Sequence, residues 1–286
     1  MKSLLYITII IASILQAVYA GLPNGVIKLA DIPYGNSPQQ TMDVYKTDGV
    51  QNAPVIFMVH GGAWRIGDKE SHAVLDNKIK RWVPAGFIFI SINYRMLPEA
   101  DPLVQLQDVA KALATAQEKA QSWGGDPEKF IVMGHSAGAH LVGLLAASPS
   151  IGLKVGAQKW LGNILLDTAA LDVTEIMKSG HMRFYDDAFG KDPEFWKMAS
   201  PVNNLSAEAY PMLVICSSRR KNSCNEARVF TDQAKSLGIK VSMLEQDMTH
   251  RQINQELGLP GAYTNHVEDF MRNLDARVNS LLSSNK

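Results

Sequence analysis

The 286-residue sequence has few cysteines and no excess of charge of either sign. Its only cysteines are Cys216 and Cys224, and neither their spacing nor neighbouring histidines suggests a zinc site. The 28 basic and 28 acidic residues balance without any block of like charge, which argues against nucleic acid as a partner. No internal repeat, low-complexity run or Gly/Ser-rich linker divides the chain. We therefore expect one domain over residues 21–286.

The first 20 residues have the pattern of a secretory signal peptide. Lys2 supplies the positive charge, residues 4–17 form the apolar segment, and Ala20 ends a small-x-small cleavage site before Gly21. The apolar run is short for a membrane span, so an uncleaved anchor is the weaker alternative. We expect a periplasmic or secreted protein with no stable membrane anchor after cleavage. In such an oxidising compartment the two cysteines are expected to form a disulfide; two free thiols are the alternative.

Apolar runs of strand length alternate with helical patterns along the rest of the chain. This alternation predicts an α/β fold with a mostly parallel central sheet and helices on both faces. The expected strands are 41–45, 55–59, 87–92, 130–133, 161–166, 212–216 and 240–244. The expected helices are 71–83, 102–123, 137–147, 225–237 and 263–282. Residues 172–205 fit less well and indicate either a small helical excursion over the strand tops or an ordinary crossover.

A serine lies at the sharpest turn that the sequence predicts. The apolar run 130–133 leads into Gly134-His135-Ser136-Ala137-Gly138, and a helical stretch follows. The two glycines permit a tight strand-to-helix turn, which would lift the Ser136 hydroxyl clear of the sheet. This arrangement makes Ser136 the candidate nucleophile.

A second glycine pair follows the strand at 55–59, in the segment His60-Gly61-Gly62-Ala63-Trp64. Two glycines there would let backbone N–H groups point into the same space as the serine. The N–H groups of Gly62 and Ala63, together with that of Ala137, are candidates for holding an oxyanion. The alternative is a simple glycine turn with a core tryptophan. We expect His60 to have a structural role through a backbone hydrogen bond.

His250 is the candidate base for the serine, because it follows the last apolar strand and precedes another helical pattern. The weaker candidates are His181 in the excursion and His266 inside the final helix. A solvated loop histidine is the alternative for His250. Two further histidines flank the serine and are expected to have surface or packing roles: His135 and His140.

With these residues the chain resembles the α/β-hydrolase superfamily, and within it the HGG-type carboxylesterases that include feruloyl and acetyl-xylan esterases and arylformamidases. The resemblance covers residues 40–283. It implies a serine hydrolase that acts on a small-molecule ester without cofactor or metal. It rests on HGGAW (60–64), Asn93-Tyr94-Arg95, WGGDP (123–127), GHSAG (134–138) and His250.

One part of the family pattern is missing from the sequence. The resemblance places the triad acid after the strand at 212–216, and the loop there contains no carboxylate. Asn222 occupies roughly the expected place, and Glu226, Asp172 and Asp167 are the substitutes. Asp172 is more readily explained as a helix cap. An amide can orient an imidazole but cannot stabilise the imidazolium by charge.

The sequence thus predicts a serine hydrolase that cleaves a small carboxylic ester through an acyl-enzyme, with short acyl groups preferred. Two alternatives remain at this point. The same residues would serve an arylformamidase-type amidase. The missing acid would also suit a non-catalytic hydrolase-fold protein that binds a ligand.

Overall fold

The computed structural model describes residues 21–168 and 170–284. The predicted signal peptide lies outside these residues. Among the helices of the described part, none is long and apolar enough to cross a membrane.

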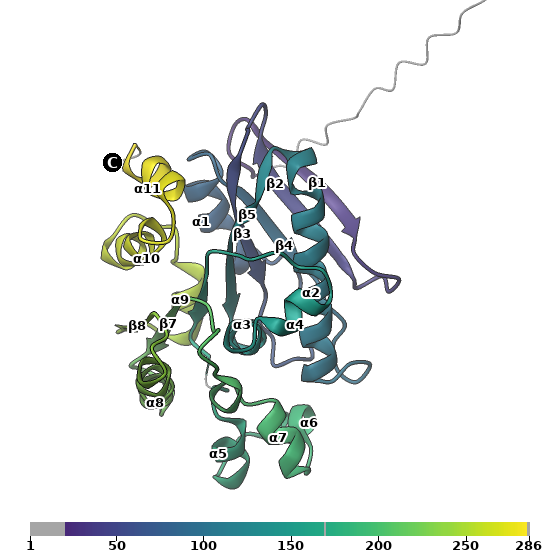
Figure 1. Cartoon of the computed structure of the whole chain (residues 1–286), viewed down its shortest axis with the longest axis vertical. Coiled ribbons are helices and arrows are strands. Elements are labelled where there is room, and N and C mark those ends of the chain that lie inside the picture. The colour runs from purple at the N-terminus through teal and green to yellow at the C-terminus, as the bar shows by residue number, and fades with distance from the viewer. Residues whose placement is uncertain (1–20, 169, 285–286) are drawn as a thin grey trace, which may run out of the picture.

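An eight-stranded mixed sheet forms the centre of the molecule (Figure 1). Its strands are β1 (Val26–Pro33), β2 (Thr41–Thr47), β3 (Ala53–Val59), β4 (Ile88–Ile92), β5 (Gly125–His135), β6 (Gly162–Leu166), β7 (Met212–Ser217) and β8 (Val241–Gln246). Their order across the sheet is β1-β2-β4-β3-β5-β6-β7-β8. Only β2 runs antiparallel to its neighbours, and all other pairs are parallel. The mostly parallel sheet that the sequence predicts is therefore confirmed.

The strand side chains alternate between two hydrophobic cores, because successive residues of a strand point to opposite faces. In β3, Val55, Phe57 and Val59 belong to one core, whereas Ile56 and Met58 belong to the other. One set of helices covers the first core: α2 (Pro102–Lys119), α3 (Ala137–Ala147), α4 (Ser150–Lys154) and α8 (Ser223–Ser236). A second set covers the other: α1 (His72–Trp82), α9 (His250–Gln255), α10 (Ala262–Arg272) and α11 (Ala276–Ser283).

The excursion at 172–205 consists of three short helices that gather at one end of the molecule (Figure 1). Asp172 caps the first of them, as predicted, by accepting a hydrogen bond from the Glu175 N–H at 3.0 Å. Phe189 is buried and joins the excursion to the core that α3 covers. The helices are α5 (Val173–Lys178), α6 (Arg183–Phe189) and α7 (Pro193–Met198), followed by the 3₁₀ turn η2 (Pro201–Asn204).

Three features differ from the predicted elements. The edge strand β1 is half exposed, so it lacks the apolar run by which the other strands are recognised. The short helices α4 and α9 were not among the predicted elements. The single helix predicted over 263–282 is two helices, because the Asp275 carboxylate accepts bonds from the N–H groups of Arg277 and Val278 and starts α11.

Candidate active site

Ser136 lies at the apex of a tight turn between β5 and α3. Its backbone has φ 56° and ψ −118°, a conformation that non-glycine residues rarely adopt, and its N–H donates to the Leu166 carbonyl at 3.0 Å. The flanking glycines allow close packing. A Cβ on Gly134 would lie 2.4 Å from the Gly138 oxygen, and one on Gly138 would lie 2.3 Å from the Val59 oxygen. The predicted turn is therefore present, and both positions require glycine because a Cβ at either one would collide with backbone atoms.

The glycine-rich segment after β3 packs directly against this turn. A Cβ on Gly61 would lie 2.8 Å from the Ser136 Cβ. Gly62 and Ala63 have φ values of 133° and 50°, so the chain turns sharply here. Within the described residues, the N–H groups of Gly62, Ala63 and Ala137 donate no hydrogen bond. Three unpartnered N–H groups beside a serine can stabilise an oxyanion.

Trp64 ties the glycine-rich segment to the rest of the site. Its indole N–H donates to Nδ1 of His140 at 3.1 Å, and Nε2–H of His140 donates to the Ala199 carbonyl at 2.7 Å. These two bonds require a neutral His140, and burial lowers the pKa of His140 to about 4. His140 has the packing role that was predicted for it.

His60 is buried and fixed to the backbone, as predicted. Its Nδ1 lies 2.9 Å from the Gly61 oxygen, and its ring stacks on Tyr94 with centroids 4.6 Å apart. The Tyr94 hydroxyl donates to the His60 carbonyl at 2.9 Å. This pair holds the start of the glycine-rich segment against the end of β4.

His250 is the first residue of α9, and its Nδ1 lies 2.5 Å from Oδ2 of Asp167. Asp167 directly follows β6 and is fully buried. His250 and Ser136 line the same cavity. The structure therefore joins His250 to Asp167, one of the substitutes considered for the acid.

The loop after β7 surrounds the Asp167 carboxylate with donors. Oδ1 accepts from the Ser217 N–H at 2.9 Å and from the Ser223 hydroxyl at 2.5 Å. Oδ2 accepts from Nη1 of Arg220 at 3.1 Å, and the same nitrogen donates to the Asp167 carbonyl at 3.0 Å. Burial raises the pKa of Asp167, but the His250 bond, the Arg220 charge and the two serine donors outweigh it and lower the pKa to about 2.

These contacts select one tautomer of His250. An ionised Asp167 can only accept, so the proton in the 2.5 Å contact belongs to Nδ1 of His250. Nη1 of Arg220 lies 2.8 Å from the same nitrogen, but its protons point to the carbonyl and Oδ2 of Asp167, so it does not need a lone pair on Nδ1. Nε2 of His250 is consequently left with its lone pair, which is the form that can take a proton from a serine.

Asn222 does not occupy the acid position, which corrects the first candidate drawn from the sequence. It precedes α8 in a left-handed conformation with φ 66°, is exposed, and makes no hydrogen bond to His250 among the described residues. The turn after β7 directs Arg220 and two serine donors inward instead. The remaining substitute, Glu226, lines the cavity without contacting His250.

His135 takes part in a contact that sequence reasoning missed. Its Nε2–H donates to the His250 carbonyl at 3.0 Å, and the two rings lie with centroids 4.5 Å apart. Burial, and then the neighbouring His250, lowers the pKa of His135 to about 3, so it is a neutral donor. The other two candidates for the base lie elsewhere, with His181 bonded to Asp186 in the cavity wall and His266 exposed on α10.

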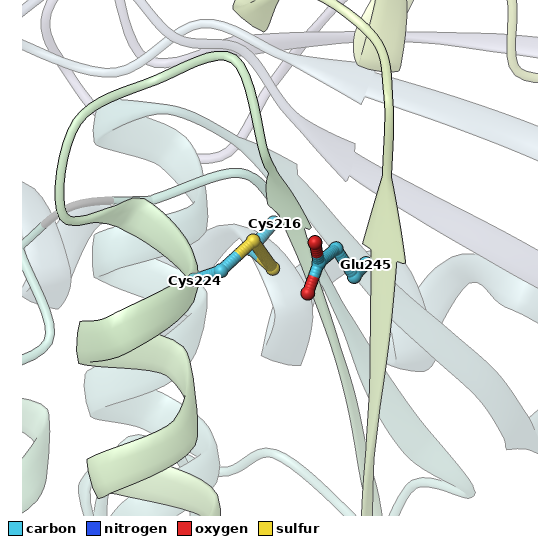
Figure 2. Close-up of side chains that lie close together, drawn as sticks. All are labelled: Cys216, Cys224 and Glu245. Atoms are coloured by element: carbon cyan, nitrogen blue, oxygen red, sulfur yellow. A yellow bond between two sulfur atoms is a disulfide. The ribbon is translucent and has the colours of Figure 1, made fainter.

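Cys216 and Cys224 form a disulfide, as predicted. Figure 2 shows it linking β7 to the first turn of α8, with Glu245 of β8 beside it. Ligand-type atoms of these three side chains lie within 4.8 Å of one another, but both sulfurs are used by the disulfide, so no thiolate is available for a metal. The disulfide closes the loop that carries the donors to Asp167.

A cavity of about 800 Å³ lies over Ser136 and His250. The excursion supplies much of its wall, and the glycine-rich segment and the loop after β7 supply the rest. Its lining residues are Ala63, Trp64, Ser136, Ala137, Thr168, Ala170, Ile176, Ser179, Gly180, His181, Met182, Phe184, Tyr185, Arg220, Lys221, Asn222, Glu226 and His250.

The model of the BD-FAE family matches residues 42–225, which is more than half of the sequence. The chain belongs to the BD-FAE family. This member is 32% identical over 203 residues to esterase LipQ of Mycobacterium tuberculosis, covering 65% of this chain and 47% of LipQ. It is 24% identical over 300 residues to isoprenylcysteine alpha-carbonyl methylesterase ICME of Arabidopsis thaliana, covering 97% of this chain and 69% of that protein. The chain spans about half the length of the first of these relatives.

This BD-FAE member has the same α/β-hydrolase fold as solved structures of other esterases. A truncated carbohydrate esterase from gut microbiota superimposes with a TM-score of 0.75 at 18% identity, covering 89% of this chain and 99% of that one. Esterase B from Lactobacillus rhamnosis superimposes with a TM-score of 0.71 at 17% identity, covering 92% and 90%. The predicted α/β-hydrolase fold is therefore confirmed.

Proposed function

We propose that this protein is a serine esterase in which Ser136 is the nucleophile, His250 the base and Asp167 the acid. The observation that carries the proposal is the His250–Asp167 contact at the edge of a cavity that Ser136 also lines. An ester carbonyl in this cavity would meet both a hydroxyl and unpartnered N–H groups. The relatives named as esterases support the same reaction class.

In the acylation step the Ser136 oxygen attacks the ester carbonyl while its proton passes to Nε2 of His250. The N–H groups of Gly62, Ala63 and Ala137 hold the oxyanion of the tetrahedral intermediate. Collapse of that intermediate breaks the bond to the alcohol oxygen, which takes the proton from His250. The product is an alcohol and an acyl-Ser136 ester.

Deacylation repeats these steps with water as the nucleophile. His250 takes a proton from water, hydroxide adds to the acyl carbonyl, and the carboxylic acid leaves as the Ser136 oxygen regains its proton. Asp167 remains ionised throughout and stabilises the imidazolium that forms in each half of the cycle. Its low pKa of about 2 keeps the charge in place at any pH at which the protein would act.

The position of Asp167 weakens the case for a non-catalytic binding protein, because that alternative was based on a missing acid. An arylformamidase-type amidase remains the second candidate, since the same groups can expel an amine. We further propose that the protein is exported. The N-terminal pattern and the Cys216–Cys224 disulfide both support an oxidising compartment.

The test combines a fluorophosphonate probe with an ester panel. Labelling at Ser136 and its loss in Ser136→Ala would support an activated serine, and circular dichroism would check that the variant folds. The panel contains 4-nitrophenyl esters of increasing chain length, acetylated and feruloylated sugars, and formylkynurenine. Hydrolysis of formylkynurenine alone would favour the amidase. An unlabelled serine and no turnover of any member would overturn the proposal.

A further inference from the structure

Among the described side chains that line the cavity, Glu226 is the only one with a carboxyl group, and the proposed mechanism does not use it. It lies in the first turn of α8. Its Oε2 atom is buried and has no hydrogen-bond partner in the described part of the chain. A buried polar atom without a partner costs roughly 1–3 kcal/mol, so a group facing a cavity in this state is suited to a ligand.

Glu226 is also neutral under ordinary conditions. Burial raises its pKa, the carboxylates of Asp172, Asp167 and Glu175 add to the effect, and the Arg220 charge opposes it, which leaves a pKa of about 8. Below that pH the carboxylic acid has an O–H donor, which an ionised carboxylate lacks.

The residues beside Glu226 on the cavity wall are cationic. Arg220 uses Nη1 for Asp167, while its Nε and Nη2 atoms donate no hydrogen bond among the described residues. Lys221 follows it, is exposed, and makes no ion pair within the same residues. This part of the wall therefore contains two cations and one neutral carboxylic acid, and each of the three can donate a hydrogen bond to a ligand.

We propose that Arg220, Lys221 and Glu226 form a subsite for a carboxylate group carried by the ester substrate. The inference rests on the proposed esterase function and specifies its substrate class. A carboxylate accepts from a guanidinium in the geometry that arginine favours, and it accepts the O–H of a carboxylic acid at the same time. A substrate hydroxyl would satisfy Glu226 but would leave Lys221 without a counter-charge and the Nε and Nη2 atoms of Arg220 without an acceptor.

The rest of the cavity fits the other parts of such a substrate. Apolar and aromatic side chains supply a second part of the lining, from Trp64 of the glycine-rich segment and from Met182, Phe184 and Tyr185 of the excursion. Trp64 packs against Tyr185 with ring centroids 5.9 Å apart. A hydrocarbon or aromatic segment between the ester and the carboxylate would lie against these groups.

The test uses two matched pairs of esters, because the carboxylate could be on the acyl or on the alcohol side. The acyl-side pair is mono(4-nitrophenyl) adipate and 4-nitrophenyl hexanoate, with 4-nitrophenyl adipamate as a neutral polar control. The alcohol-side pair is 4-acetoxybenzoate and 4-acetoxybenzamide. At pH 6.5 we expect kcat/KM to favour the carboxylate by about tenfold or more in one pair, the range of one charged hydrogen bond. Ratios near one in both pairs, or a preference for the neutral polar members, would overturn the proposal.

Variants of the wall residues test whether the preference for a carboxylate comes from this subsite. Glu226→Leu and Lys221→Gln should each lower the carboxylate-to-neutral ratio, whereas Glu226→Gln keeps a neutral donor and should preserve it. Asp232→Asn is the matched control, because Asp232 is an exposed carboxylate on the same helix. A ratio that is unchanged in Glu226→Leu would contradict the assignment.

The pH dependence of the ratio gives an independent readout. Between pH 6.5 and 9 Glu226 ionises and repels a substrate carboxylate, so the wild-type ratio should fall. The charged groups that act on Glu226 are Arg220, Asp172, Asp167 and Glu175, and all four are the same in the wild type and in Glu226→Gln. His181 also lines the cavity, and it is present in the wild type and in Glu226→Gln alike. The fall should therefore be larger in the wild type than in Glu226→Gln, and equal falls would count against the subsite.

Binding to Ser136→Ala separates this inference from the esterase proposal. In that variant 4-acetoxybenzoate should bind more tightly than 4-acetoxybenzamide, as measured by calorimetry at pH 6.5. Hydrolysis of neutral esters without a carboxylate preference, in turnover or in binding, would remove the subsite and leave the esterase proposal standing. Tighter carboxylate binding without any turnover would support the subsite and remove the esterase.

Discussion

Replacing Asp167 with Asn is the perturbation that most directly tests the site, because it exchanges one carboxylate oxygen for an NH₂ group and leaves the shape of the side chain intact. In the wild type each carboxylate oxygen accepts two hydrogen bonds. An asparagine can offer an oxygen at only one of these positions, and its NH₂ group must face donors at the other.

The surroundings determine which position receives the NH₂ group. The Oδ1 position faces the N–H of Ser217, which is fixed in the backbone at the end of β7. The Oδ2 position faces Nδ1 of His250, whose proton can move to the other ring nitrogen, and Nη1 of Arg220, which keeps the backbone carbonyl of residue 167 as an acceptor. We therefore expect the NH₂ group to face His250 and donate to Nδ1. His250 then holds its proton on Nε2 and cannot accept one from Ser136.

The same exchange in a serine protease lowers kcat by about 10⁴, through the same change of tautomer. We expect a loss of about 10³–10⁴ in kcat here, measured with 4-nitrophenyl acetate, with a parallel loss in the rate of fluorophosphonate labelling. Asp172→Asn is the matched control, since Asp172 caps α5 and has no bond to His250. Asn222→Asp should bring no gain. An Asp167→Asn enzyme within tenfold of the wild type would refute the reasoning.

Two further predictions concern the groups around Asp167. Reduction of the Cys216–Cys224 disulfide should cost about 2–3 kcal/mol in the free energy of unfolding. Reduction should also lower kcat by more than this loss of stability alone would cause, because the closed loop carries the donors of Arg220 and Ser223 to Asp167. An unchanged kcat after confirmed reduction would contradict this. The lowered pKa of Asp167 adds stability that is present above its unfolded pKa of about 3.9 and is lost as the pH falls toward 2. Denaturant titrations should therefore show about 2 kcal/mol more loss between pH 4 and pH 2 in the wild type than in Asp167→Asn, and equal losses would argue against it.

The sequence was sufficient for the parts of the site that depend on local patterns. Glycines at tight approaches, apolar strands and the turn at Ser136 are each visible within a few residues. The disulfide was predicted from two cysteines in a chain whose N-terminal pattern is that of an export signal. The structural role of His60 was predicted from its position at a strand end, where an imidazole can bond to the backbone of the following loop.

The identity of the residue beside His250 depends on distances between segments that are far apart in the chain. Asp167 and His250 are separated by 83 residues and meet because β6 and β8 lie on either side of β7. Because these strands are parallel, their carboxyl ends lie at the same edge of the sheet, and Asp167 was therefore a reasonable candidate. Choosing it over Asn222 required the direction of the turn after β7, which side-chain packing determines and no local pattern reveals. The same holds for Arg220 and for the ring contact between His135 and His250.

The bonds of His140 have a consequence for how ligands enter the cavity. Through Trp64 and Ala199 this one imidazole connects the glycine-rich segment to the end of α7, so the excursion is fastened to the same groups that would hold the oxyanion. Lifting the excursion as a movable cover would pull on those N–H groups. The excursion therefore acts as a fixed wall, and a hydrolase built in this way has no reason to wait for an oil–water interface before it turns over.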